Sequence, residues 1–276
     1  LKLLGDVLEN GKMRKTRNGI TYGSFDHQLC FDVSDSFPLL TTKKMFWKGI
    51  VEELLFFMRG ETNSKLLEDK GIKIWQGNTS RKFLDSLNLN YEEGEMGPMY
   101  GYQWRYFNKP YGDKEGGVDQ FKQLIDDIIN NPNSRRLLMT DYNPCQANQG
   151  VLYPCHSLIL QFYCNDNKLS VKMYQRSADL FLGVPFNIAS TTLLLYIVAK
   201  LTNKVPDTVS ITFGDCHIYS EHSEQVNTQL SRTPYELPQL ELTDFKTIGD
   251  VEQATVNDFK LIDYSCHPGI KAKMIA

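Results

Sequence analysis

The chain has 276 residues, 41% of them hydrophobic and 12% aromatic, which is enough to bury one large core, so we expect a single domain over residues 1–276. A formal net charge of −3 at pH 7 argues against a general polyanion-binding surface and against nucleic acid as the main partner, so phosphate binding would require a local arginine cluster. No apolar run approaches the roughly 20 residues of a membrane span, and the first residues do not resemble a signal peptide, so no membrane contact is expected.

The first part of the chain predicts strands and one amphipathic helix. After a helix-like start, residues 17–23 predict a turn that feeds strands, because an Asn-Gly pair tolerates positive φ. Apolar residues recur at helical spacing over 46–58, and this helix ends at Gly60. It also carries Glu52 and Glu53, so an acidic pair lies on a helix that faces the core.

The rest of the chain alternates apolar helices with β-rich runs. The expected elements are a helix at 118–129, strands at 157–164, 168–175 and 209–213, a highly apolar helix at 186–201 and a helix at 219–230. The polar residues 165–167 predict a hairpin between the first two of these strands. Strands mixed with long helices, without strict βαβ alternation, indicate an α+β domain.

Six cysteines are spread along the chain without a CxxC pair, at positions 30, 145, 155, 164, 216 and 266. This usage is typical of reduced thiols in a cytosol-like compartment, so we expect a cytoplasmic protein. Three of the cysteines precede a histidine. Adjacent Cys and His side chains diverge on a strand, however, and the ligand spacing of zinc modules is missing, so no metal is expected.

Cys155 has the strongest case for chemistry. A cysteine is usually a small buried hydrophobe. Here a proline precedes it and His156 follows it, and Arg135, Arg136 and Arg176 can supply the positive field that lowers the pKa of a thiol. The residues alone leave both interpretations open.

The arginines allow two interpretations as well. Arg17 falls in the expected turn, the pair Arg135 and Arg136 at an expected strand start, and Arg176 beside Ser177 at a strand end. An arginine pair is commonly a solvated face. Arginines beside hydroxyl groups can also bind a phosphate dianion bidentately, which lysines do less selectively.

Glu53 and Asn187 each have a structural and a functional interpretation. Glutamate is almost never fully buried without partners, so Glu53 faces solvent or, if it lines a cleft, acts as a proton relay with a raised pKa. Asn187 opens an apolar helix, and helix-start statistics favour an N-cap there. A carboxamide also donates and accepts at once, which suits the N3–H and O4 edge of uracil.

Short motifs along nearly the whole chain resemble the thymidylate synthase family. They occupy residues 37–44, 53–55, 59–63, 74–75, 97–101, 103–105, 134–136, 154–156, 174–190, 214–219 and 267–276. The resemblance implies a mixed β-sheet with helices on one side and a homodimer whose protomers meet sheet to sheet. Arg135 and Arg136 would cross the interface into the phosphate pocket of the partner.

The resemblance also implies the substrates and the residues that bind them. The substrates would be dUMP and 5,10-methylenetetrahydrofolate. The implied catalytic residues are Cys155, Glu53, Tyr100, His156, Asn187 and Asp179. The implied nucleotide-binding residues are Arg17, Arg135, Arg136, Gln175, Arg176, Ser177, Asn187, His217 and Tyr219. The implied folate-binding residues are Lys43, Trp75, Asn78, Asp179, Leu182, Gly183 and Ala276.

The implied reaction is a reductive methylation that converts dUMP to dTMP. Cys155 would add to C6 of the uracil and make C5 a nucleophile toward the methylene group of the folate, and Glu53, helped by Tyr100 and His156, would move protons. A hydride from tetrahydrofolate then completes the methyl group.

Departures from the family pattern in two places leave an alternative open. Gln76 stands where aspartate is typical, and Asp141-Tyr142 stands where Ala-Trp is typical, and both departures can alter water at the cofactor. If water reached the exocyclic methylene before hydride, the product would be 5-hydroxymethyl-dUMP, so a nucleotide hydroxymethylase is the alternative. A third hypothesis is a non-catalytic paralogue that binds nucleotide or RNA. The presence of Cys155 and Glu53 argues against it.

Overall fold

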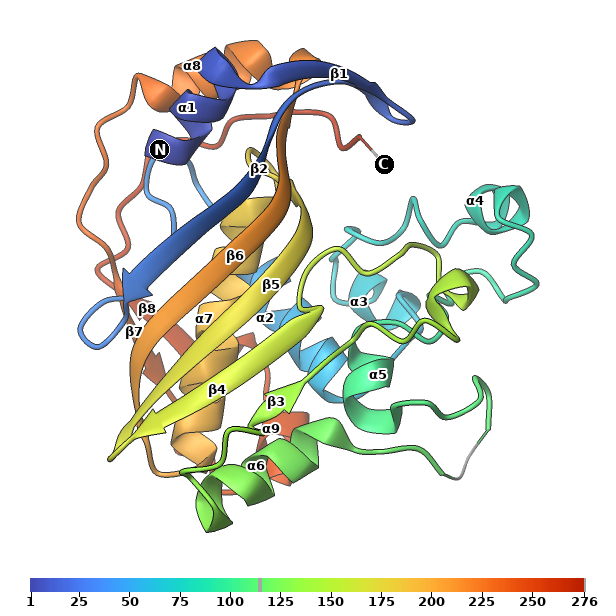
Figure 1. Cartoon of the computed structure of the whole chain (residues 1–276), viewed down its shortest axis with the longest axis vertical. Coiled ribbons are helices and arrows are strands. Elements are labelled where there is room, and N and C mark those ends of the chain that lie inside the picture. The colour runs from blue at the N-terminus through green and yellow to red at the C-terminus, as the bar shows by residue number, and fades with distance from the viewer. Residues whose placement is uncertain (114–115, 276) are drawn as a thin grey trace.

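A computed structural model describes residues 1–113 and 116–275. Its main feature is a six-stranded sheet with strand order β1-β2-β6-β5-β4-β3 (Figure 1). The strands are β1 (Lys12–Thr16), β2 (Gly19–Asp32), β3 (Leu138–Met139), β4 (Ile159–Asn165), β5 (Lys168–Asp179) and β6 (Val205–Tyr219). Neighbours pair antiparallel except β5 and β6, which are parallel, so the sheet is mixed as expected.

Two hairpins arise from local turn chemistry. The turn at Arg17 and Asn18 joins β1 to β2, with Thr16 opposite Gly19, and Gly19 takes φ 133°, which glycine adopts without steric cost. The second turn, at Asp166 and Asn167, joins β4 to β5, and Asp166 has φ 53°. Both turns confirm the sequence prediction.

The parallel pair β5 and β6 needs a crossover, and helix α7 (Gly183–Leu201) supplies it. This helix has 19 residues and a mean hydropathy of 1.5, so by length and composition it meets the requirement for a membrane span. The expectation that no apolar run approaches that length was therefore wrong. Because 72% of its apolar window is buried inside the fold, the apolar sequence is explained by contact with the sheet.

Helices cover one face of the sheet. Figure 1 shows α7 and α2 (Trp47–Met58) behind the strands, and α2 packs against α7 and α5 (Gly101–Tyr106). The other helices are α1 (Lys2–Asn10), α3 (Lys65–Glu68), α4 (Arg81–Ser86), α6 (Gln120–Asn130), α8 (Ser223–Leu230) and α9 (Ile248–Gln253), with short 3-10 turns at Ala147–Gln149, Ser220–His222 and Val256–Asp258. A small second sheet pairs β7 (Gln239–Leu242) with β8 (Phe259–Ile262).

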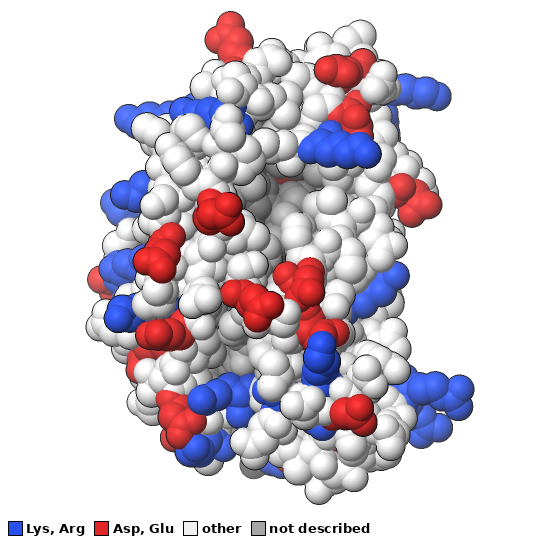
Figure 2. All heavy atoms as spheres, turned by 90° about the vertical axis from the view of Figure 1, so that its left-hand side faces the viewer, with Lys and Arg blue, Asp and Glu red and all other residues white. Residues whose placement is uncertain are grey.

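The opposite face of the sheet carries no helix in Figure 1. Residues of β4 alternate between exposed and buried, as expected for a sheet with one covered face. Several large apolar or aromatic side chains on these strands are nevertheless exposed: Phe25, Ile159, Tyr163 and Tyr174. Figure 2 shows another side of the molecule, where basic and acidic side chains are interspersed and no continuous basic surface forms.

Several predicted boundaries were wrong. The strand expected at 209–213 is β6, which runs on to Tyr219, so the helix expected from 219 begins only at Ser223. Pairing with both β2 and β5 keeps this segment extended, and that long-range pairing outweighs its local helical pattern.

Candidate active site

Cys155 lies in the loop that leads into β4, and β5 holds this loop in place. The backbone N–H groups of Arg176 and Ser177 donate to the carbonyl of Cys155, at 2.8 and 3.3 Å. The Arg176 side chain also donates through Nε to the carbonyl of Pro154, at 3.2 Å. Three hydrogen bonds therefore fix the backbone that carries the thiol.

Tyr100 contacts Cys155 at two atoms. Its Oη lies 3.4 Å from Sγ of Cys155 and accepts a 3.3 Å hydrogen bond from the backbone N–H of the same residue. The Tyr100 ring stacks on Phe57 and His156, with centroids 5.0 and 4.6 Å away. Tyr100 has φ 46° at the start of α5, an uncommon backbone conformation for a bulky residue that is often found at functional sites.

The thiol of Cys155 is less acidic than the sequence suggested. Burial raises its pKa, while the Tyr100 hydroxyl and the Arg176 charge act in the opposite direction. We expected three arginines to lower the pKa of this thiol, and for a single chain that expectation was wrong. Of the three, only Arg176 acts on the thiol, and desolvation outweighs its effect.

Arg135 and Arg136 are not brought to Cys155 within one chain. Both lie exposed in a turn before β3, not at the strand start. Arg136 lines a groove with Gln123 and Asp127 of α6, and no residue of that groove lines the cavity beside His156. Arg17 is also exposed, in the turn between β1 and β2, where its Nε donates to the side chain of Asn18.

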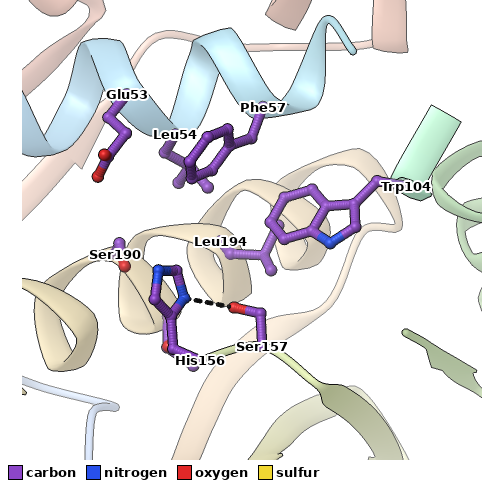
Figure 3. Close-up of a pocket in the computed structure, with 9 residues that line it drawn as sticks. Glu53, Leu54, Phe57, Trp104, His156, Ser157, Ser190 and Leu194 are labelled. Carbon is purple, nitrogen blue, oxygen red and sulfur yellow. Dashed lines mark hydrogen bonds between the residues drawn. The ribbon is translucent and has the colours of Figure 1, made fainter. Parts of the chain in front are cut away.

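Glu53 and His156 line a small, partly open cavity between α2, α7 and the Cys155 loop (Figure 3). Its volume is about 10 Å³, roughly what one water molecule requires. Burial raises the pKa of Glu53 to about 7, although the Trp75 indole donates to its carboxylate at 2.7 Å. Burial also lowers the pKa of His156 to about 4, so the imidazole is neutral at neutral pH. The half-buried Glu53 thus faces the cavity, not solvent.

Asn187 is not an N-cap. Helix α7 begins at Gly183, so Asn187 lies at the end of its first turn, and Oδ1 of Asp179 instead accepts the N–H groups of Phe181 and Leu182 at 2.9 and 3.0 Å. The buried Gln175 donates through Nε2 to Oδ1 of Asn187, at 2.9 Å. This contact orients the Asn187 carboxamide.

His217 and Tyr219 lie together on β6, with ring centroids 5.3 Å apart. Nδ1 of His217 is 3.0 Å from Oδ1 of Asp215, and Arg14 of β1 donates to Oδ2 of the same carboxylate at 2.5 Å. Sequence reasoning missed Asp215 and Arg14. The i, i+2 spacing of Asp215 and His217 on one strand was the available signal, because such residues share a face.

The predicted folate-binding residues differ in how deeply they are buried. Trp75 is almost fully buried, whereas Asn78, Leu182 and Gly183 are half-buried. Lys43 is buried, and its ammonium donates to the carbonyl of Phe181 and lies 3.7 Å over the Phe181 ring, while burial lowers its pKa to about 8. Folate binding by Lys43 stays a prediction. Ala276 lies outside the described residues.

The three residues that depart from the family pattern differ in their exposure to solvent. Gln76 is exposed and donates to Glu68 at 3.1 Å. Tyr142 is 37% exposed, whereas Asp141 is buried. Among residues 1–113 and 116–275, no cluster of three His, Cys, Asp or Glu side chains has an arrangement that could hold a metal ion.

Comparison with known proteins identifies the family of the chain. A family model described as thymidylate synthase matches residues 1–276. The chain belongs to the thymidylate synthase family. It is similar to the thymidylate synthases of human herpesvirus 8 type P (isolate GK18) and Homo sapiens, at 44% identity to each, with 99% of this chain and 82% and 90% of those proteins covered.

Longer relatives are also similar. The bifunctional dihydrofolate reductase-thymidylate synthase of Paramecium tetraurelia is 44% identical, and the alignment covers 99% of this chain but 60% of that protein. The chain thus spans about three fifths of this bifunctional relative. The alignment with each of these three relatives covers 99% of this chain, so the family assignment applies to the whole described fold.

Proposed function

We propose that this thymidylate synthase family protein converts dUMP to dTMP, with 5,10-methylenetetrahydrofolate as co-substrate. The observation that carries the proposal is the contact of Cys155 Sγ with the Tyr100 hydroxyl, 3.4 Å apart, in a loop that β5 fixes. Proteins named thymidylate synthase that align over nearly the whole chain support the same activity.

Cys155 is the proposed nucleophile. Its thiolate forms a bond to C6 of the uracil, and the electron pair of the C5–C6 double bond moves toward O4, which makes C5 nucleophilic. Because burial raises the pKa of this thiol, the proton must leave with help from the Tyr100 hydroxyl and the Arg176 charge, which both favour the thiolate. The folate supplies the one-carbon unit and the hydride.

Asn187 is proposed to recognise the pyrimidine. The Gln175 side chain donates to its Oδ1, which leaves Nδ2 free to donate to O4, while a second lone pair of Oδ1 can accept from N3–H. A neutral His156 and a Glu53 that titrates near pH 7 are suited to exchange protons at O4 and C5 through one water in the cavity.

The residues present fit the folate. Oδ1 of Asp179 accepts from the N–H groups of Phe181 and Leu182, just before α7, and Oδ2 has no hydrogen bond to the described residues, so it can accept from a pterin N–H. Trp75 lies against Tyr100 with ring centroids 6.0 Å apart and can form an apolar wall for the ring system. Leu182 and Gly183 begin the adjacent helix, so we assign them, with Asn78 and Lys43, to the same binding region.

We further propose a homodimer that meets through the uncovered sheet face. Exposed Phe25, Tyr163 and Ile159 on strands of that sheet give it an apolar surface of the kind that interfaces bury. A partner would bring Arg135 and Arg136 to the phosphate of the other protomer, where Arg17, Arg176 and Ser177 would complete the pocket and His217 with Tyr219 would hold the 3′-hydroxyl. Arg135 and Arg136 are exposed, and Arg136 lines a groove that shares no residue with the His156 cavity of its own chain. Both observations support this role.

A combined product assay tests the proposed activity. The protein is incubated with dUMP and the folate. The mass of the nucleotide product is measured by mass spectrometry, and dihydrofolate formation is followed by absorbance. We expect dTMP and dihydrofolate in equal amounts, and no turnover from Cys155→Ser, which should still bind dUMP because it keeps the phosphate and pyrimidine contacts. Formation of 5-hydroxymethyl-dUMP with release of tetrahydrofolate would establish the hydroxymethylase alternative instead.

A further inference from the structure

Asp141 is a buried acid without a partner. The residue is 1% exposed, and neither carboxylate oxygen has a hydrogen-bond partner in another residue of 1–113 and 116–275. Burying a polar group without a hydrogen bond is costly, and acidic residues are almost never buried unpaired. A carboxyl group buried at such a cost requires an explanation other than packing.

The backbone around Asp141 is fixed. The amide of Gln120 bonds both to the Thr140 N–H, at 3.0 Å, and to the Thr140 carbonyl, at 2.7 Å. The Thr140 hydroxyl donates to the carbonyl of Leu158. Met139, two residues before Asp141, pairs with Leu160. The residue before Asp141 is therefore bonded to Leu158, at the end of the loop that carries Cys155.

A negative charge on Asp141 affects the pKa of the reactive thiol. A carboxylate at this position raises the pKa of both Cys155 and Tyr100, whose side chains contact each other. The other ionisable groups around the thiol are His156, which is neutral at neutral pH, Arg176, which favours the thiolate, and Glu53 across the cavity. Burial raises the pKa of Asp141 well above the ordinary carboxyl value, so this acid keeps its proton to a higher pH than an exposed carboxyl group does.

We propose that Asp141 is a positioning residue that controls the ionisation of Cys155. While Asp141 holds its proton, the thiol is free to ionise in the field of Arg176. Once Asp141 becomes a carboxylate, its negative charge keeps the proton on Sγ, because two anions in one dry space repel each other strongly. The inference rests on the proposed function, in which Cys155 is the nucleophile.

Alkylation of the free protein tests this inference without turnover. Wild type, Asp141→Asn and Asp141→Ala are treated with iodoacetamide from pH 6 to pH 10, and mass spectrometry of the Cys155 peptide gives the rate at each pH. We expect both variants to alkylate at lower pH than wild type, by about one pH unit, which makes them about tenfold faster at pH 8. Exposed Cys145 is the control within the same chain, and its profile should not change.

Two outcomes would overturn the inference. Identical Cys155 profiles in wild type and Asp141→Asn would mean that Cys155 ionises before Asp141 and is not controlled by it. A faster reaction in Asp141→Ala alone would mean that entry of water, not charge, limits the thiol. Thermal unfolding and dUMP binding confirm that each variant is folded. A wild type that makes no dTMP would contradict the proposed function, and the alkylation result would still stand.

Discussion

The indole Nε1 of Trp75 donates a 2.7 Å hydrogen bond to Oε1 of Glu53. This bond joins the residue proposed to shield the folate to the residue proposed to move protons. An indole donor favours the ionised carboxylate, yet burial is the larger effect and raises the pKa of Glu53 to about 7. The site therefore holds an acid that titrates near neutral pH.

The raised pKa of Glu53 predicts a pH-dependent effect on stability. Its ordinary pKa is 4.5, so between pH 4.5 and 7 the folded chain binds more protons at this residue than the unfolded chain, and the free energy of unfolding falls as pH rises. Glu53→Gln removes the ionisable group, so its free energy of unfolding should not fall with pH for this reason, and the glutamine oxygen can still accept the hydrogen bond from the Trp75 indole. We expect it to be more stable than wild type at pH 8, on the order of 2 kcal/mol, and unchanged at pH 4. Urea unfolding at both pH values measures this.

Glu52→Gln is the matched control for Glu53. The Glu52 carboxylate is buried and pairs with the Lys70 ammonium at 2.6 Å, so its removal should lower stability at pH 8. A Glu53→Gln variant that loses stability at pH 8 as Glu52→Gln does would contradict a desolvated Glu53.

Replacing Asn187 by Asp is expected to shift the substrate preference from dUMP toward dCMP. The carboxamide of Asn187 suits uracil, whereas a carboxyl group that keeps its proton can donate to cytosine N3 and accept from the 4-amino group. The Gln175 side chain still has an oxygen to which it can donate, so the orientation should persist. The ratio of kcat/KM for the two nucleotides is the measurement, and an unchanged ratio would remove Asn187 from pyrimidine recognition.

Mixed dimers test whether Arg136 acts across an interface. Arg136→Glu and Cys155→Ser proteins are each expected to be inactive, and subunit exchange should restore activity to heterodimers. In such a dimer one site combines native Cys155 of one chain with native Arg136 of the other. Two tagged proteins allow heterodimers to be purified before assay. If purified heterodimers stayed inactive, Arg136 would serve its own chain.

Shortening the C-terminus by residues 275–276 is expected to slow hydride transfer more than it weakens binding. The His222 imidazole contacts the Lys273 carbonyl at 2.9 Å, which anchors the chain just before the shortened residues. A segment that closes over an active site protects the reaction from water. Dihydrofolate absorbance reports the hydride step, and equilibrium dialysis of dUMP with folate reports binding. Equal losses in both measurements would argue against a closing role.

Local patterns in the sequence determined much of the fold. The apolar stripe of α2, the hairpin turns at Asn18 and Asp166 and the apolar length of α7 all depend on neighbours within a few residues. The motifs around Cys155 and Asn187 likewise identified the family, because each motif is a short contiguous run. For these features, residues close in sequence carry the information.

Only the tertiary structure decided the state of the site. The raised pKa of Cys155 and the burial of Asp141 without a partner in another described residue both depend on segments far apart in the chain, and no local pattern encodes desolvation by distant segments. The length of β6 follows from its pairing with β2 and β5. Burial and strand pairing depend on contacts between residues far apart in the chain. The sequence therefore identified the reactive residues, whereas the fold determines how readily they ionise.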